Sequence, residues 1–229
     1  MKKVNKIENG MKTGKWIWSY DNGQIEVEGF YKSGRLDSHW IWYHKNGKIA
    51  LEATYKQGKA DGKYCEYFKN GNVKECGEYN SGKRTGKWIE YFSNKTIKRV
   101  GKYSTGKKVE KWISYFANGN VKKEENYDTG KFVCYYQNTQ IEMKGFMKNG
   151  KPNGKWVEYY QNGEIKKEVN YKANKMDGKW IWFYDNGKIK KVGYYKNGKR
   201  NGEFLYYYKS GKIQKRENWE NSKLIRTGK

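Results

Sequence analysis

The sequence predicts an all-β protein, namely an elongated, single-layer antiparallel β-sheet of tandem β-hairpin repeats. Three observations support this prediction. Large aromatic residues recur every 24 residues along most of the chain, Asn-Gly pairs recur between them, and a glycine-centred segment joins each unit to the next. A fixed period of about 20 to 50 residues is typical of repeat proteins, in which each unit packs against its neighbours.

A first aromatic row marks the start of each unit. Its spacing is 24 residues except for one interval of 20, so the sixth unit is shortened. The row comprises Trp16, Trp40, Tyr64, Trp88, Trp112, Phe132, Trp156, Trp180 and Phe204. A second aromatic position follows four residues later, as at Tyr20 and Tyr184, and His44 is most simply a substitute for tyrosine there.

An aliphatic row and a closing ring row complete each unit. The aliphatic row comprises Ile25, Ile49, Val73, Ile97, Val121, Ile141, Ile165, Ile189 and Ile213. The closing ring row comprises Tyr31, Tyr55, Tyr79, Tyr103, Tyr127, Tyr171, Tyr195 and Trp219, with Met147 as the exception.

The Asn-Gly pairs, such as Asn22-Gly23, predict two-residue type I′ hairpin loops, because both central residues of that turn have positive φ. Such a loop fixes the strand register. It pairs Tyr20 with Ile25, and it pairs Trp16 with Gly29 so that the ring covers the glycine. The segment that links one unit to the next is expected to be the longer turn.

Side chains alternate between the two faces of a strand. We expect one face to carry both aromatic positions, the aliphatic row and the closing ring row, and to form the main core. The other face is expected to carry lysines, a further aliphatic row and a tyrosine row. These two rows comprise Ile17, Ile41, Ile89, Ile113 and Ile181, and Tyr43, Tyr67, Tyr91, Tyr115, Tyr135, Tyr159 and Tyr207.

We interpret residues 1–229 as a single repeat array. Residues 1–13 form a partial N-terminal unit, residues 14–219 form nine hairpin units, and residues 220–229 are a C-terminal remnant. The start of the chain has no apolar signal-peptide core, and no segment has the roughly 20 apolar residues of a membrane span. The three cysteines are an odd and sparse set, which does not indicate a disulfide framework. We therefore expect a cytoplasmic protein.

No motif for catalysis, cofactor binding or metal binding is found. The only two histidines, His39 and His44, lie on one predicted strand, and the aspartates fall in turns, where Asp bonds the local backbone. We expect no catalytic residues, no metal and no cofactor. Cys65 and Cys76 are predicted cross-strand partners. A disulfide or a metal pair is feasible there, but two reduced thiols packed as small apolar side chains are the favoured interpretation.

The formal net charge of +25 favours an acidic partner. In the predicted register, tyrosine-row residues lie directly opposite lysines and form a stripe of rings and ammonium groups. This stripe comprises Tyr67, Lys74, Tyr91, Lys98, Tyr115, Lys122, Tyr159 and Lys166. It suits nucleic acid, where lysine neutralises phosphates and rings stack on bases, or anionic lipid. Against this, a lysine stem packs on a ring without any ligand, and solvated lysine limits aggregation.

A second candidate site lies two residues after the first aromatic row. This position is Glu or Ser in several central units, but toward the ends of the chain it is Trp18, Trp42, Trp182 and Tyr206. Exposed Trp and Tyr are typical anchors of protein interfaces. The first two are expected to form a tryptophan cluster with their first-row neighbours near the N-terminus. Alternatively, these rings cover the open ends of the sheet.

The pattern at Gly154–Lys172 and Gly178–Lys199 runs Gly-Lys-Trp, a ring pair, Asn-Gly, Ile-Lys and a closing Tyr. It resembles the MORN repeat, and more closely the bacterial variant often labelled as the repeat antitoxin of a toxin–antitoxin pair. The resemblance covers essentially the whole chain. It implies a single-layer hairpin sheet used for protein contacts, for dimer formation or for attachment to acidic lipid, and at most an inhibitory protein–protein role. It brings no catalytic residues.

The sequence thus predicts a non-enzymatic, macromolecule-binding repeat protein that docks, and inhibits or scaffolds, a protein partner with an acidic surface. Direct binding of nucleic acid or anionic membrane through the stripe is the alternative. A homodimer is compatible with either interpretation, and a small-molecule substrate is not expected. The dependence of affinity on salt separates protein docking from nucleic-acid binding, because the affinity for phosphates falls steeply between about 50 and 200 mM salt.

Overall fold

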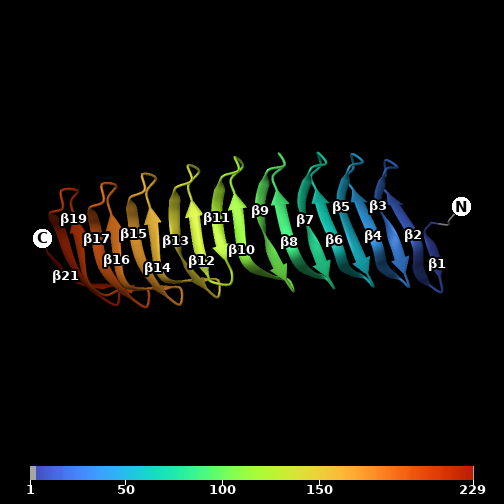
Figure 1. The fold of residues 1–229 in the computed structure, drawn as a ribbon. Helices are drawn as coiled ribbons and strands as arrows, with labels where there is room; N and C mark the ends of the chain where they lie inside the picture. The colour runs from blue at the N-terminus through green and yellow to red at the C-terminus, as the bar shows by residue number, and fades with distance from the viewer. Residues whose placement is uncertain (1–3, 229) are drawn as a thin grey trace. The chain divides into compact units, whose positions relative to one another are not determined.

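The computed structural model describes residues 4–228 and contains only strands and turns over that range. It confirms an all-β fold of tandem antiparallel hairpins (Figure 1). The chain divides into two compact units, Met1–Gly119 and Asn120–Lys229. Within the described range there is no helix long and apolar enough to cross a membrane.

The N-terminal unit is a single antiparallel layer in which each strand pairs with the next. The strands are β1 (Lys6–Glu8), β2 (Met11–Ser19), β3 (Ile25–Lys32), β4 (Arg35–Tyr43), β5 (Ile49–Lys56), β6 (Lys59–Tyr67), β7 (Val73–Asn80), β8 (Lys83–Tyr91), β9 (Ile97–Ser104) and β10 (Lys107–Tyr115).

The C-terminal unit has the same construction, with one interrupted strand. The strands are β11 (Val121–Asn126), β12 (Lys131–Tyr135), β13 (Ile141–Lys148), β14 (Lys151–Tyr159), β15 (Ile165–Lys172), β16 (Lys175–Phe183), β17 (Ile189–Lys196), β18 (Lys199–Arg200), β19 (Gly202–Tyr207), β20 (Ile213–Glu220) and β21 (Lys223–Gly228). Both β18 and β19 pair with β17, and β21 pairs with β20.

The predicted register is confirmed along the body of each hairpin. Trp16 is the cross-strand partner of Gly29, and Trp18 is the partner of Val27. The same relation pairs Glu90 with Arg99 in the N-terminal unit. The 24-residue period therefore corresponds to one hairpin plus its link to the next.

The prediction of a type I′ turn at Asn-Gly is wrong. Only the glycine has positive φ, +81° at Gly23, whereas Asn22 does not. The amide of Gly23 donates to the Tyr20 carbonyl, and the amide of Tyr20 donates to the Gln24 carbonyl. This is a three-residue loop that ends in a left-handed residue. Lys95 and Thr139 take the glycine position in two units, with φ of +72° and +70°.

A β-bulge follows each of these loops and compensates for the extra loop residue. In the first hairpin Ser19 pairs with Ile25, then the register shifts, and Trp18 pairs with Val27. The predicted pairing of Tyr20 with Ile25 is therefore wrong, and so is the placement of the aliphatic row on the tryptophan face. Directly paired residues share a face, so the aliphatic row lies on the same face as the tyrosine row. We call this the second face, and we call the face that carries the first aromatic row the tryptophan face.

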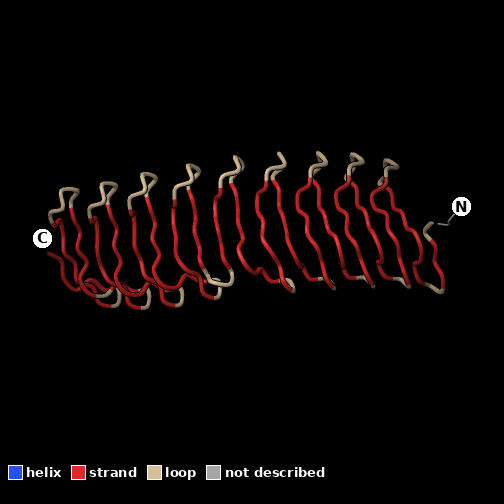
Figure 2. The backbone as a smooth tube through the Cα atoms, in the orientation of Figure 1, coloured by secondary structure: helices blue, strands red, loops and turns tan. Residues whose placement is uncertain are grey.

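The tight two-residue turns are instead the links between units. At Ser33-Gly34 both residues have positive φ, +49° and +75°, which defines a type I′ turn. The expectation that the link is the longer turn is wrong, because the Asn-Gly loops are longer. Within each unit the two kinds of turn lie at opposite ends of the strands (Figure 2). We call the end with the type I′ turns the linker-turn edge.

The core forms where an aromatic ring packs on a glycine of the preceding hairpin. Trp16 faces Gly29 in the backbone ladder, but the ring over that glycine is Trp40, since a Cβ added at Gly29 would lie 2.1 Å from Trp40 Cδ2. The prediction that Trp16 covers Gly29 is thus wrong, because the covering ring is Trp40, the next member of the first aromatic row. Trp40 is only 2% exposed, and the same arrangement recurs at Gly77, Gly101, Gly145 and Gly193.

The least exposed rings of the first aromatic row all follow such a glycine. After Gly77 and Gly101, the rings of Trp88 and Trp112 are both 2% exposed. Where Val169 stands in the glycine position, the next ring, Trp180, is not buried. A side chain at this position takes the space into which the indole would settle.

Hydrogen bonds join successive hairpins at the Asn-Gly end of the strands. The Tyr20 hydroxyl donates to the Tyr43 carbonyl at 2.6 Å, and His44 Nε2 lies 3.1 Å from the equivalent Tyr67 carbonyl. The interpretation of His44 as a substitute for tyrosine is confirmed, because it bonds the same group of the next hairpin.

Candidate binding surfaces

A ladder of four indole rings lies on the tryptophan face of the N-terminal unit. Trp16 and Trp18 have ring centroids 5.4 Å apart, Trp18 and Trp40 are 6.0 Å apart, and Trp40 and Trp42 are 5.8 Å apart. The first-row rings Trp16 and Trp40 are buried, whereas Trp18 and Trp42 are half-buried. The predicted tryptophan cluster is confirmed, and the two half-buried rings, Trp18 and Trp42, remain accessible to a partner.

The ladder borders an open hollow of about 380 Å³. The hollow is lined by Trp18, Glu26, Val27, Tyr31, Leu36, Trp40 and Trp42. At one side Lys12 Nζ lies 4.6 Å from the Trp16 ring centroid and 5.0 Å from that of Trp18. Apolar rings beside a cation suit a partner that offers an apolar anchor next to an acidic group.

The predicted stripe of paired tyrosines and lysines is not formed. Tyr67 pairs with Val73 rather than Lys74. In the same way Tyr91 pairs with Ile97, and Tyr159 pairs with Ile165. The physical reason is the bulge, which takes up the lysine as its extra residue and directs it to the other face. For the remaining predicted pair, Tyr115 and Lys122 belong to different compact units.

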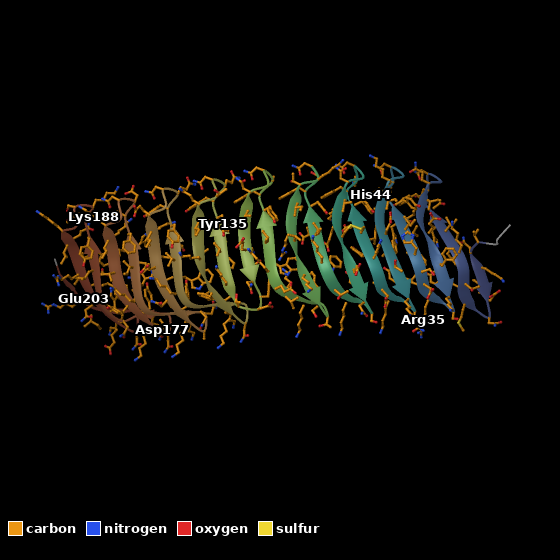
Figure 3. All side chains as sticks on the ribbon, viewed as in Figure 1. Arg35, His44, Tyr135, Asp177, Lys188 and Glu203 are labelled. Atoms are coloured by element: carbon orange, nitrogen blue, oxygen red, sulfur yellow. A yellow bond between two sulfur atoms is a disulfide. The ribbon has the colours of Figure 1, made fainter. Side chains whose placement is uncertain are left out.

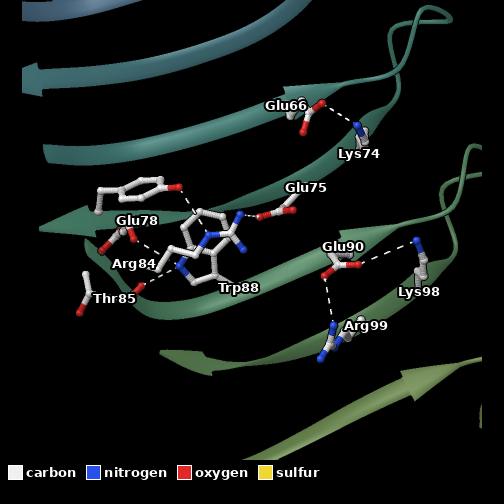
Figure 4. A network of polar contacts seen from close by, with 11 residues as sticks. Glu66, Lys74, Glu75, Glu78, Arg84, Thr85, Trp88, Glu90, Lys98 and Arg99 are labelled. Carbon is white, nitrogen blue, oxygen red and sulfur yellow. Dashed lines mark hydrogen bonds and ion pairs between the residues drawn. The ribbon is translucent and has the colours of Figure 1, made fainter. Parts of the chain in front are cut away.

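These bulge lysines bind carboxylates on the tryptophan face, as Figure 4 shows for two hairpins. Lys74 Nζ lies 2.6 Å from a Glu66 oxygen, and Lys98 Nζ lies 4.0 Å from Glu90. In the C-terminal unit Lys166 Nζ lies 4.0 Å from Glu158. Part of the charge assigned to the stripe is therefore neutralised within the protein.

The like-charged neighbours Glu66 and Glu75 are accommodated by an arginine. Arg84 Nη2 lies 2.6 Å from Glu75 Oε1, and its guanidinium carbon lies 3.9 Å from the Trp88 ring centroid (Figure 4). Burial raises the pKa of Glu75, and the charge of Arg84 acts in the opposite direction. These ion pairs join β6, β7 and β8 on the tryptophan face.

The tyrosines of the second face bond to acidic residues. The Tyr43 hydroxyl donates to Glu28 at 2.7 Å, and Lys15 Nζ lies 2.8 Å from the same carboxylate. The bond with Lys15 and then that with Tyr43 lower the pKa of Glu28. Burial, followed by the bond to Glu28, raises the pKa of Tyr43 to about 12. These rings are structural partners of carboxylates on this face.

In the C-terminal unit the two predicted anchors share a lysine. Lys191 Nζ lies 5.6 Å from the Trp182 ring and 5.2 Å from the Tyr206 ring. The Tyr206 hydroxyl donates to Glu217 at 2.7 Å, and Trp219 Nε1 donates to the same oxygen at 3.0 Å. Glu217 is only 7% exposed. Tyr206 therefore satisfies a buried carboxylate, and both anchors of this unit are half-buried.

The linker-turn edge carries basic residues that the sequence interpretation did not single out. Lys or Arg flanks most of its type I′ turns, on one side or on both. Figure 3 shows Arg35 at this edge and His44 at the opposite edge. The sequence signal for this edge is the pattern Lys-x-Gly-Lys, which occurs at residues 56–59, 148–151 and 196–199.

The cysteines differ from the favoured interpretation. Cys65 and Cys76 are cross-strand partners, as predicted, and they form a disulfide rather than two free thiols. Their Cα atoms lie 4.3 Å apart, close enough for a bond without backbone movement. Cys134 is free, and burial raises the pKa of its thiol to about 11. In the part of the chain that the structure describes, no three His, Cys, Asp or Glu side chains cluster as metal ligands.

Comparison with known proteins identifies a family for this chain. The model of the family described as "MORN repeat variant" matches residues 12–33, 36–57, 60–81, 111–129, 152–173, 176–197 and 200–221. No curated protein is significantly similar to the sequence.

Among solved structures, the chain is similar to the TcdB2-TccC3 complex, with 11% identity and a TM-score of 0.23 over 92% of this chain and 14% of that one. It is similar to a Photorhabdus luminescens Tc holotoxin pore, with 12% identity and a TM-score of 0.22 over 90% and 13% of the two chains. It also resembles a GtfA/B complex bound to UDP and GlcNAc, with 14% identity and a TM-score of 0.21 over 45% and 21%. The chain thus spans about a fifth or less of these proteins.

Proposed function

Since the chain belongs to the MORN repeat variant family, we propose that it is a non-enzymatic binding protein that docks a protein partner with an acidic surface and thereby inhibits or scaffolds it. Repeat arrays of this kind present extended surfaces for binding. The observation that carries the proposal is the indole ladder of the N-terminal unit, in which Trp18 and Trp42 are half-buried and the cation of Lys12 lies over the Trp18 ring.

The chemistry of the ladder favours protein docking. Tryptophan is enriched among the residues that dominate binding energy at protein interfaces. Its ring contributes a large apolar area with few rotatable bonds. The net charge of +25 would accelerate encounter with an acidic partner.

The test is capture of the partner by the tagged full-length protein from its source cells, comparing three forms. The wild type should retain a protein partner. The variant Trp18→Ala/Trp42→Ala should weaken the complex by about 30-fold or more, since loss of an interface anchor costs at least about 2 kcal/mol.

The control is Phe146→Ala, which removes a ring that is 53% exposed on the second face. It should retain the partner as the wild type does. Equal retention by the wild type and the double tryptophan variant would rule out the ladder as the docking site.

A further inference from the structure

At the linker-turn edge, cations face each other directly across the tight turns. In the N-terminal unit Lys32 pairs with Arg35, and Lys56 pairs with Lys59. The next two turns each carry one cation, because Asn80 pairs with Lys83 and Ser104 pairs with Lys107. The C-terminal unit repeats the arrangement, with the pairs Lys148–Lys151, Lys172–Lys175 and Lys196–Lys199.

These cations are exposed and have no salt bridge within residues 4–228. The cations of the N-terminal unit are Lys32, Arg35, Lys56, Lys59, Lys83 and Lys107, all of them exposed. The nearby Asp37 and Asp61 carboxylates accept backbone amides of the following turn, at 3.4 and 3.2 Å, and form no salt bridge with these cations. The edge thus presents cations to solvent, whereas lysines on the two sheet faces bind carboxylates.

Stability alone would not select this arrangement. Like charges directly opposite each other across a strand pair are destabilising, and the chain itself shows the neutral alternative at Asn80–Lys83. Protection of an open strand edge does not explain the pairs, since β4 and β5 are hydrogen-bonded on both sides. An arrangement that costs stability is expected where binding requires it.

The spacing and composition of the edge indicate what would bind there. Successive linker turns are two strands apart, or about 10 Å, which is close to three rises of about 3.4 Å along the axis of a DNA duplex. The turn centres are small or polar, as at Ser33-Gly34, Gln57-Gly58, Ser81-Gly82 and Thr105-Gly106. These four turn centres of the N-terminal unit offer no ring to stack on a base and no apolar side chain to enter a bilayer.

We propose that the linker-turn edge binds the phosphate backbone of nucleic acid without reading its sequence. The cation row neutralises phosphates, and binding relieves the repulsion between the facing cations. This surface is separate from the indole ladder, so the two can be tested independently. A regular row of charge matches the regular charge of a nucleic-acid backbone better than the irregular surface of an acidic protein.

The experiment measures binding of a fluorescein-labelled DNA duplex of about 24 base pairs to the full-length protein, by fluorescence anisotropy from about 50 to 200 mM salt. The edge variant is Lys56→Gln/Lys59→Gln/Lys83→Gln/Lys107→Gln. The control variant, Lys45→Gln/Lys48→Gln/Lys69→Gln/Lys95→Gln, removes the same charge from exposed lysines at the Asn-Gly end of the same strands.

The wild type should bind with an affinity that falls steeply with salt, by about 0.9 in logarithmic slope per phosphate contact. The edge variant should lose about tenfold or more in affinity at about 100 mM salt, with a shallower slope, and the control less than about threefold. Replacing the same four edge lysines by arginine should preserve binding. The edge variant should melt no lower than the wild type, because repulsion has been removed.

Three results would overturn the proposal. The first is equal loss of affinity in the edge and control variants, which would indicate a response to net charge alone. The second is absence of duplex binding by the wild type. The third is edge-dependent binding to vesicles containing phosphatidylserine with no binding to the duplex. The Trp18→Ala/Trp42→Ala variant should bind the duplex normally, so failure here leaves the indole ladder as a separate question.

Discussion

Replacing Gly101 with alanine tests the packing of each indole ring on the preceding hairpin. A Cβ at this position would lie 2.1 Å from Trp112 Cδ2, so the ring must move by about 1.4 Å to reach an ordinary contact of about 3.5 Å. Overpacking of this kind costs about 1–3 kcal/mol. Gly101 does not have positive φ. Without the ring, the change to alanine would therefore stabilise the protein by about 0.4–1 kcal/mol through the unfolded chain.

The sign of the stability change therefore decides the question. Equilibrium unfolding in urea, followed by tryptophan fluorescence, should show Gly101→Ala to be less stable than the wild type, with emission shifted to longer wavelength. Adding Trp112→Tyr reproduces the natural pair Ala53 and Tyr64 and should recover part of the loss. A Gly101→Ala protein as stable as the wild type, or an equal loss whichever residue stands at position 112, would refute this explanation of the core.

Three further changes test other contacts. Substituting His44 with phenylalanine should lower the free energy of unfolding by about 0.5–1.5 kcal/mol, because the hydrogen bond to the next hairpin is lost. Substituting His44 with tyrosine should leave the melting temperature unchanged, and equal melting temperatures of the two variants would contradict the contact. The pKa of Glu28 is lowered below its ordinary value of 4.5, first by Lys15, so its charged form stabilises the fold above about pH 4.5 and this contribution is lost as pH falls through the lowered pKa. Glu28→Gln should thus lower the melting temperature at pH 7, and its difference from the wild type should shrink as the pH falls further below about 4.5; an equal difference at neutral and at acidic pH would argue against the linkage. Reducing the bond between Cys65 and Cys76, separated by 11 residues, should cost up to about 3 kcal/mol, and unchanged urea unfolding with and without reductant would count against its role.

The fold and most of the register could be predicted from the sequence because the period and the strand alternation are local signals. The turn type could not be predicted. Asn-Gly suits a two-residue type I′ turn and also a three-residue loop ending in a left-handed residue. A bulge after the loop restores the register, so Trp18 pairs with Val27 in either case. The pattern of the hairpin therefore did not reveal the difference.

That one-residue difference explains the error in the candidate site. The bulge directs Lys74 to the tryptophan face, where it binds Glu66, while Tyr67 stays on the second face near Glu52. The tryptophan cluster was predictable because its members lie on one face at fixed spacing. The linker-turn edge could not be predicted in the same way. The sequence pattern assigned the tight turns to the Asn-Gly end of the strands, so the cations that flank the linker turns were not expected to face each other.

The measurement that most directly tests the proposed function is the mass and composition of the complex that the tagged full-length protein retains from its source cells, after nuclease treatment and a wash at about 200 mM salt. We predict a second protein in fixed stoichiometry that is lost in the Trp18→Ala/Trp42→Ala variant. Recovery of the chain alone, or of nucleic acid that nuclease removes with nothing left bound, would contradict docking of a protein partner on the indole ladder.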